Sequence, residues 1–387
     1  MSNIMNLVKS LVAMLLITLV IFELSSFAVT KMELFLFNET PSVYRFGSNT
    51  NYRDIVYGRT ERDPWGAWHA PNGTYTHTMF CFNVEMTFNE VGARDSSFSD
   101  LSENSLFLLG DSFAEGFGVS YEDTSQYIIE RELGVEIANF GVAGDFGPLQ
   151  ELLIYREFHY LQHNGLIIYV LPANDFTDND ANFWAGISRQ RYRPYFGNDD
   201  GNPLVPYYFT EAKKRDNFLD PTGGVIKQFI KDYFWSANAL RTALVMLRGN
   251  TRNASIDEDS IESFFYDANA QQQINLLLAY EEILDLAGER DVLFVIIPGI
   301  RDIRRRKAEN LPDSYKQQTW YQGLQTFESR QQHKVSLLNL MDHVPVDTSG
   351  MFHVCDGHWS PRGNNWAATT IAEHIRRNNL FPTIVSQ

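Results

Sequence analysis

The chain has 387 residues, of which 44% are hydrophobic, so it is long enough for one large domain or two modest ones with a packed core. Its formal net charge of -16 argues against nucleic acid as a partner, because an acidic surface repels a phosphate backbone. The same charge disfavours docking on anionic lipid head groups.

The N-terminal segment predicts a membrane-associated helix. Residues 11–22 read LVAMLLITLVIF, and the apolar stretch runs on to Val29 with only Glu23 charged. This is near the length of about 20 residues that spans a bilayer as a helix. A small-residue site at Ser26-Phe-Ala28 leaves a removable signal peptide as the rival interpretation. We assign residues 1–31 to an anchor or signal peptide, with the anchor favoured by length and the rest of the chain exported.

The chain after this segment divides into a lead-in and a main domain. Residues 32–100 are rich in aromatics, Asn, Gly and Thr, and predict an irregular lead-in that contains β-structure and packs on the main domain. Residues 101–387 contain short, continuous apolar runs typical of parallel strands that are buried on both faces. The runs are LFLL at 106–109, GLIIYVL at 165–171 and DVLFVIIP at 291–298, with weaker ones at 135–139 and 334–340.

Helical patterns alternate with these runs. The predicted helices are 124–133, 147–163, 271–287 and 361–378. Strand and helix in alternation indicate an α/β fold: a five-stranded, mainly parallel sheet with helices on both sides, in three layers. Residues 181–265 interrupt the order and are too long for a simple crossover, so we interpret them as a cap or substrate-facing insertion.

Polar segments follow four of the predicted strands. In an open parallel sheet, ligands bind beyond the carboxyl ends of the strands. The segments are Gly110-Asp111-Ser112, residues 139–145, residues 172–175 and Asp356-Gly-His358. We therefore expect a serine, a histidine, carboxylates and an amide side chain to meet at one edge of the sheet.

These residue types suit nucleophilic catalysis. A serine hydroxyl needs an adjacent base, here His358, and the base needs an orienting carboxylate, here Asp356. A tetrahedral oxyanion needs donors, for which the candidates are the backbone N–H groups of Ser112 and Gly144 and the amide of Asn174. Each residue also has an ordinary structural alternative, since Asp, Ser and Asn make turns and helix caps. Only the four segments together favour the catalytic interpretation.

At these residues the sequence resembles the SGNH/GDSL hydrolase superfamily. Its four blocks are matched by GDSFAEGFGV at 110–119, NFGVAGDFGP at 139–148, PANDF at 172–176 and DGHWSPRGN at 356–364, and FNEVGARD at 88–95 is similar to the stretch before the first block in membrane-anchored members. The resemblance implies a flavodoxin-like three-layer fold, chemistry without metal or cofactor, and ester hydrolysis or acyl transfer. It assigns Ser112 as the nucleophile, Gly144 and Asn174 as oxyanion donors, and Asp356 and His358 as the remaining catalytic residues.

The last block departs from the family pattern. Only Gly357 separates Asp356 from His358, where the family usually has two residues. Asp356 could therefore orient His358 differently, or a backbone carbonyl could replace it and leave a Ser-His dyad. The Asp-x-His-Trp form resembles periplasmic polysaccharide O-acetyltransferases, which implies an acylated carbohydrate as substrate.

Three further features allow two interpretations each. The two cysteines, Cys81 and Cys355, could form one disulfide or remain buried thiols. The run from Arg301 to Lys307 could bind an anionic glycan or form a solvated helix face. Aromatic residues of the insertion could stack on sugar rings or pack a lid: Phe183, Trp184, Tyr192, Tyr195, Phe196, Tyr207 and Tyr208.

The sequence therefore predicts an extracytoplasmic serine esterase or O-acyltransferase that acts on an acylated carbohydrate. The alternatives are a non-catalytic carbohydrate-binding member of the same fold and a lipase or thioesterase. The oligomeric state is left open.

Overall fold

The protein is described from a computed structural model. The structure describes residues 2–36, 64–66, 68–79, 82–144, 146–185, 193–197, 203–208, 234, 236, 240, 262–330, 335–353 and 356–382. The chain divides into two compact units, one containing helix α1 and the other containing the five-stranded sheet, and each is described by itself. Tyr192, Cys81 and Cys355 lie outside the described residues, so the choice between a disulfide and two thiols stays open.

Helix α1 (Ser2–Leu36) contains the apolar N-terminal stretch. Its segment Met5–Ala28 has a mean hydropathy of 2.3 and is long and apolar enough to cross a membrane. A signal sequence has the same length and composition, so the choice between anchor and signal peptide stays open.

The central sheet has five parallel strands. In spatial order they are β4 (Ile137–Asn139), β3 (Leu106–Leu109), β5 (Gly165–Val170), β8 (Asp291–Ile296) and β9 (Val335–Asn339). Counted along the chain this is the order 2-1-3-4-5 of flavodoxin-like folds. Nearly every strand residue is buried, as expected for strands covered on both faces. The predicted α/β fold with a five-stranded parallel sheet is confirmed.

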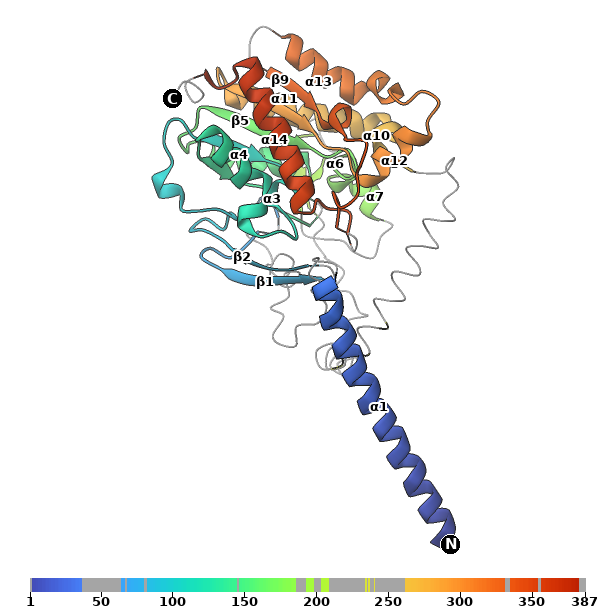
Figure 1. The fold of residues 1–387 in the computed structure, drawn as a ribbon. Coiled ribbons are helices and arrows are strands. Elements are labelled where there is room, and N and C mark those ends of the chain that lie inside the picture. The colour runs from blue at the N-terminus through green and yellow to red at the C-terminus, as the bar shows by residue number, and fades with distance from the viewer. Residues whose placement is uncertain are drawn as a thin grey trace. The chain divides into compact units, whose positions relative to one another are not determined.

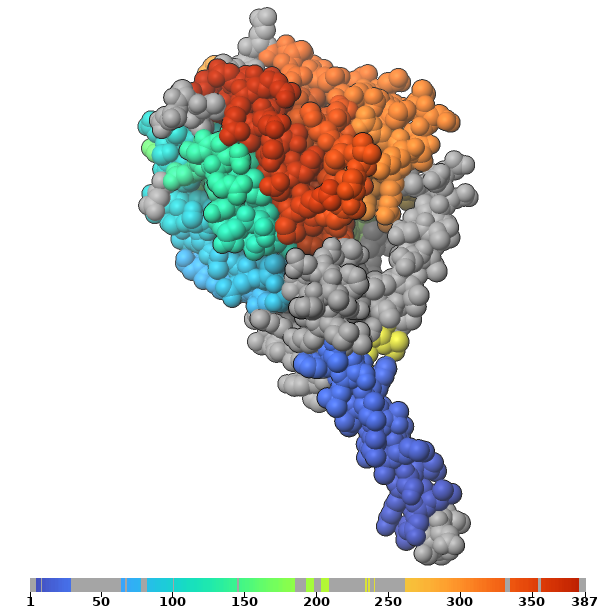
Figure 2. All heavy atoms as spheres, in the orientation of Figure 1, coloured from blue at the N-terminus to red at the C-terminus, as the bar shows by residue number. Residues whose placement is uncertain are grey.

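Helices cover both faces of the sheet (Figure 1). On one face α4 (Ser125–Leu133) packs against α14 (Pro361–Asn378), and Figure 2 shows the two side by side at the surface. On the other face α11 (Ala270–Ala287) packs against both α5 (Pro148–Phe158) and α13 (Thr319–Ser329). The other α-helices within the described residues of the main unit are α3 (Ser112–Glu115), α6 (Asp175–Asp178), α7 (Ala181–Ala185), α10 (Phe264–Asp267) and α12 (Ile300–Ala308).

The four helices expected from the sequence are present. Helix α13 was not expected. Its buried residues Trp320, Leu324 and Phe327 follow the spacing of one helix face, a signal too short to stand out beside its Gly323. Helix α5 ends at Phe158, earlier than the predicted boundary at residue 163.

Part of the lead-in packs into the core of the main unit. Strands β1 (Thr74–Met79) and β2 (Phe82–Thr87) form a two-stranded sheet. The ring of Trp65 lies 5.6 Å from that of Phe158, and Trp68 stacks on Phe140 at 6.2 Å. These contacts join the lead-in to the residues that follow β4 and to α5.

The described part of the insertion includes α7 and the short strands β6 (Tyr195–Phe196) and β7 (Pro206–Tyr207). Its aromatic side chains divide between two environments. Trp184, Tyr195 and Phe196 are buried and pack the structure, whereas Phe183 and Tyr207 are exposed. Of the aromatic residues that were singled out, Phe183 and Tyr207 are exposed enough to meet a sugar ring.

A partly buried carboxyl on α4 predicts that stability falls as pH rises. Burial, with a further contribution from the charge of Asp95, raises the pKa of Glu130 from 4.5 to about 7. Between these values the folded protein keeps a proton that the unfolded chain has lost, so the free energy of unfolding falls with rising pH. For one such group the slope is at most about 1.4 kcal/mol per pH unit.

The Glu130→Gln variant removes this titration and should flatten the dependence of the unfolding free energy on pH between about pH 5 and pH 7. Denaturant unfolding at several pH values measures the slope. Glu132→Gln, an exposed carboxyl on the same helix, is the control and should leave it unchanged. An unaltered slope in Glu130→Gln would contradict the raised pKa of Glu130.

Candidate active site

The serine lies at the turn from β3 to α3. The carboxylate of Asp111 accepts a hydrogen bond of 3.0 Å from the N–H of Phe113 and so caps α3 at its N-terminus. Ser112 follows as the first residue of the helix, with 7% of its surface exposed. The cap thereby sets the hydroxyl at the carboxyl end of a central strand.

The histidine and the second carboxylate come from the loop that precedes α14. A backbone bridge between Phe352 and Trp359 closes this loop, and the N–H of His353 donates to the carbonyl of His358 at 2.9 Å. His358 Nε2 then lies 2.6 Å from Ser112 Oγ, although 246 positions separate the two residues. The structure thus brings the predicted serine and histidine within hydrogen-bonding distance.

Asp356 holds the other side of the imidazole. Its Oδ1 contacts His358 Nδ1 and also accepts the backbone N–H of His358 at 3.1 Å. With Gly357 alone between them, one carboxylate oxygen reaches both groups, so the short spacing does not prevent the expected contact. Burial pushes the pKa of Asp356 upward, but its hydrogen bonds from His358 and the charge of that ring outweigh burial and lower the pKa.

Aromatic rings surround the imidazole. Phe117 lies 4.3 Å and Phe113 5.1 Å from the ring of His358, between centroids. On its other side Phe117 contacts His77 of β1 at 4.4 Å. Burial lowers the pKa of His77 to about 4, so this lead-in histidine is neutral at physiological pH.

The loop after β4 carries the predicted backbone donor Gly144. Its φ of 113° is one that side-chain-bearing residues rarely adopt. Nearby, a Cβ on Gly141 would lie 2.4 Å from the backbone nitrogen of Glu115, so only glycine allows the loop to approach α3 this closely. The N–H of Ala143 donates to the Glu115 carboxylate at 3.0 Å, which ties the residue before Gly144 to the helix that carries Ser112.

The side-chain amide of Asn174 binds two carboxylates of the site. Its Nδ2 lies 3.2 Å from Asp111 Oδ2 and 2.6 Å from Asp178 Oδ2. The same Asp111 Oδ2 lies 3.5 Å from Ser112 Oγ. Burial raises the pKa of Asp111 above its ordinary value. The structure therefore places Asn174 beside the serine, with its amide hydrogens directed at carboxylate oxygens.

Sequence reasoning missed the buried groups that support α3 from the lead-in. His69 Nε2 lies 2.9 Å from Glu115 Oε1, and both side chains are fully buried. Arg94 donates to the carbonyl oxygens of Glu115, Gly116 and Val119 at 2.9, 2.5 and 2.6 Å. The only sequence signal was the resemblance of residues 88–95 to a family stretch, which identified the segment but not these contacts.

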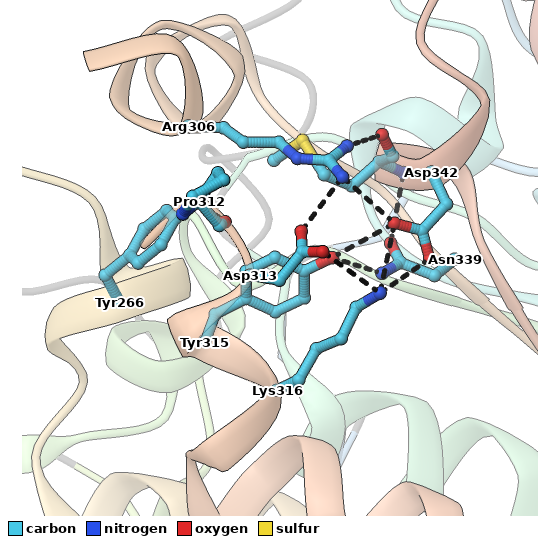
Figure 3. Close-up of polar contacts among 9 residues, drawn as sticks. Tyr266, Arg306, Pro312, Asp313, Tyr315, Lys316, Asn339 and Asp342 are labelled. Carbon is cyan, nitrogen blue, oxygen red and sulfur yellow. Dashed lines mark hydrogen bonds and ion pairs between the residues drawn. The ribbon is translucent and has the colours of Figure 1, made fainter. Parts of the chain in front are cut away.

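Two arginines of the basic run on α12 form ion pairs within the protein. Arg305 forms an ion pair with Glu309, and Arg306 binds Asp313 and Asp342 at 2.9 and 3.3 Å. Figure 3 shows this network, which extends to Lys316, Tyr315 and the β9 residue Asn339. These contacts fix the turn that follows β9, and they favour a structural role for Arg305 and Arg306 over glycan binding.

No three His, Cys, Asp or Glu side chains are grouped to hold a metal ion within the described residues. The histidines of the region have other contacts: His358 meets Ser112 and Asp356, and His69 meets Glu115.

The sequence matches no family model, and no curated protein matches it. Among solved structures, the chain is similar to a protein named as a lipolytic protein of the G-D-S-L family from Desulfitobacterium hafniense DCB-2, with 10% identity and a TM-score of 0.35 over 70% of this chain and 98% of that one. It is also similar to the lipase Lip_vut3 from a goat rumen metagenome, with 12% identity and a TM-score of 0.35 over 70% and 96% of the two chains. A third similarity is to the acetyl xylan esterase Est2A from Butyrivibrio proteoclasticus, with 9% identity and a TM-score of 0.35 over 72% and 65%. At these TM-scores we base the function on the geometry of the site.

Proposed function

We propose that the protein is a serine esterase or O-acyltransferase of the SGNH/GDSL type, which works through an acyl-serine intermediate. The observation that carries this proposal is the contact of 2.6 Å between His358 Nε2 and Ser112 Oγ, with Asp356 on the opposite ring nitrogen. In this order the imidazole acts as the base for the serine hydroxyl, and the carboxylate orients the imidazole and stabilises its protonated form.

The geometry suggests the first half-reaction. Asp356 accepts a hydrogen bond from the Nδ1–H of His358, which fixes the tautomer whose Nε2 lone pair receives the proton of Ser112. Ser112 Oγ attacks the ester carbonyl carbon, and the carbonyl oxygen becomes an oxyanion. His358 then returns the proton to the departing alcohol, and the acyl group remains on Ser112.

The second half-reaction needs an acceptor hydroxyl. His358 would remove the proton of the acceptor as the acceptor attacks the acyl-serine, and would then give that proton to Ser112 Oγ as the acyl–oxygen bond breaks. Water as acceptor makes the enzyme an esterase, and a sugar hydroxyl makes it an O-acyltransferase. The Asp-x-His-Trp motif and the exposed rings of Phe183 and Tyr207 support an acylated carbohydrate as the substrate.

The test uses the full-length chain, purified in detergent, with a fluorophosphonate probe and with p-nitrophenyl acetate. Stoichiometric labelling of Ser112 and hydrolysis of the ester are expected. Release of acetate from acetylated oligosaccharides, with and without added acceptor sugars, then separates hydrolysis from transfer. Absence of both labelling and turnover would favour the non-catalytic alternative.

We also propose that α1 anchors the chain, with the site on the extracytoplasmic side. An apolar helix of this length supports membrane retention. In a bacterial host, the chain should remain in the membrane fraction after a high-salt wash, and a C-terminal alkaline phosphatase fusion should be active. Release into the soluble fraction would indicate a cleaved signal peptide instead, and an inactive fusion would place the site in the cytoplasm.

A further inference from the structure

The side-chain amide of Asn174 is held by two acceptors. An amide nitrogen has two hydrogens, and here its partners are Asp178 Oδ2 at 2.6 Å and Asp111 Oδ2 at 3.2 Å. The shorter contact is to Asp178, one helical turn further along α6. The longer one points toward the serine, because Asp111 Oδ2 also lies 3.5 Å from Ser112 Oγ.

Asp178 is in turn bound by a residue of the insertion. Its side chain is 2% exposed, and Arg193 Nη1 lies 3.5 Å from its Oδ1 and donates to its carbonyl oxygen at 3.1 Å. The guanidinium of Arg193 is buried and lies 4.4 Å from the ring centroid of Trp184. Trp184 in turn donates its indole N–H to the carbonyl of Thr177 at 2.8 Å. A segment far from the catalytic motifs thus fixes one carboxylate against Asn174.

We infer that Asp178 is a positioning residue, which acts through Asn174 to direct one amide hydrogen at the oxyanion formed on Ser112. The inference rests on the proposed function, since it presupposes that oxyanion. An ionised carboxylate accepts hydrogen bonds and donates none, so Asp178 stabilises only the amide orientation that presents Nδ2. With one hydrogen bound to Asp178, the other points toward Ser112. In the resting enzyme Asp111 accepts it, and the oxyanion takes it during the reaction.

The charge of Asp178 is part of this arrangement. Burial raises the pKa of Asp178 to about 7, and Arg193 opposes that rise. Three other carboxyl groups face it: Asp111, Glu151 of α5 and Asp175 of α6. A protonated Asp178 can donate to the oxygen of a flipped Asn174 amide, so the orientation is no longer unique. Arg193 lowers the pKa of Asp178 and so favours the ionised form, which holds this orientation.

The first test is Asp178→Asn, which keeps the shape of the side chain but can donate as well as accept. We expect kcat for p-nitrophenyl acetate to fall by about 10²–10³, the loss typical of one oxyanion donor, with KM unchanged. Asn174→Ala should cost about the same, and the double variant should cost no more than either single one. Arg193→Met should lower kcat more at pH 7 than at pH 9, because Asp178 then holds its proton to a higher pH.

The matched control is Asp291→Asn. Asp291 is also a buried carboxylate, but it lies at the start of β8, at the opposite edge of the sheet, and accepts the N–H of Phe381 at 3.0 Å. This variant should retain the wild-type kcat. Thermal unfolding of every variant shows whether it is folded.

Two outcomes overturn the inference: losses that add in the double variant, or an Asp178→Asn enzyme with unchanged kcat. Failure of the proposed function looks different, because the wild type would then show no turnover that depends on Ser112. Crystal structures of the wild type and of Asp178→Asn decide the inference even then. We expect the Asn174 amide to leave Asp111 in the variant, and an unmoved amide contradicts the proposal.

Discussion

Replacing Ser112 with alanine is expected to lower the turnover of p-nitrophenyl acetate by about 10⁴-fold or more, to the level that binding and oxyanion donors alone sustain. The reason is the contact of 2.6 Å with His358 Nε2, which supplies the base for this hydroxyl. Labelling by the fluorophosphonate probe should disappear together with turnover. Substrate binding should be little changed, because alanine leaves the neighbouring rings in place.

A matched serine in the same segment provides the control. Ser120 lies eight positions further along, and its hydroxyl binds the carboxylate of Asp123 at 2.6 Å. Ser120→Ala should retain labelling and turnover. Hydrolysis that persists in Ser112→Ala at the wild-type rate would show that another group is the nucleophile.

Replacing Asp356 with asparagine is expected to lower turnover by about 10³–10⁴-fold without disturbing the loop. An asparagine amide can donate to His358 Nδ1, which moves the ring proton to Nε2 and leaves no lone pair to receive the proton of Ser112. The lowered pKa of Asp356 keeps the wild-type carboxylate ionised from about pH 5 to pH 9. The loss should therefore be of similar size throughout that range.

The size of this loss separates a triad from a dyad. If a backbone carbonyl were to orient the ring, Asp356→Asn would lower turnover only slightly, and the contact of Asp356 with His358 would be structural. Steady-state kinetics on the wild type, Asp356→Asn and His358→Ala decide between the two. Turnover in His358→Ala equal to that of the wild type would contradict the proposed mechanism as a whole.

Much of the fold could be read from local patterns. Apolar runs such as residues 106–109 and 291–298 predict buried strands, because a strand that is covered on both faces has no face exposed to solvent. Alternation with helical segments then predicts the parallel sheet, and the structure has it. Helix α13 was not predicted, because its four buried residues lie among Gly323 and a majority of polar residues.

The order of strands also indicated where reactive side chains would gather. The ends of parallel strands meet at one edge, so Ser112, Asn174 and His358 could be expected there without coordinates. The hydrogen bonds between these side chains could not be predicted from the sequence. The sequence left open whether Asp356 reaches His358 across a single glycine, and the loop closed by Phe352 and Trp359 decides that it does.

The sequence by itself therefore determined the layered α/β architecture, the edge of the sheet at which the site lies, and the types of reactive side chain gathered there. Each of these follows from periodicity or from spacing along the chain. Only the tertiary structure decided the supporting contacts: His69 with Glu115, and Asp178 with Asn174 and Arg193. Buried charges and amides such as these have no periodic signature, since a buried polar group is stabilised only by the particular partner that the fold brings to it.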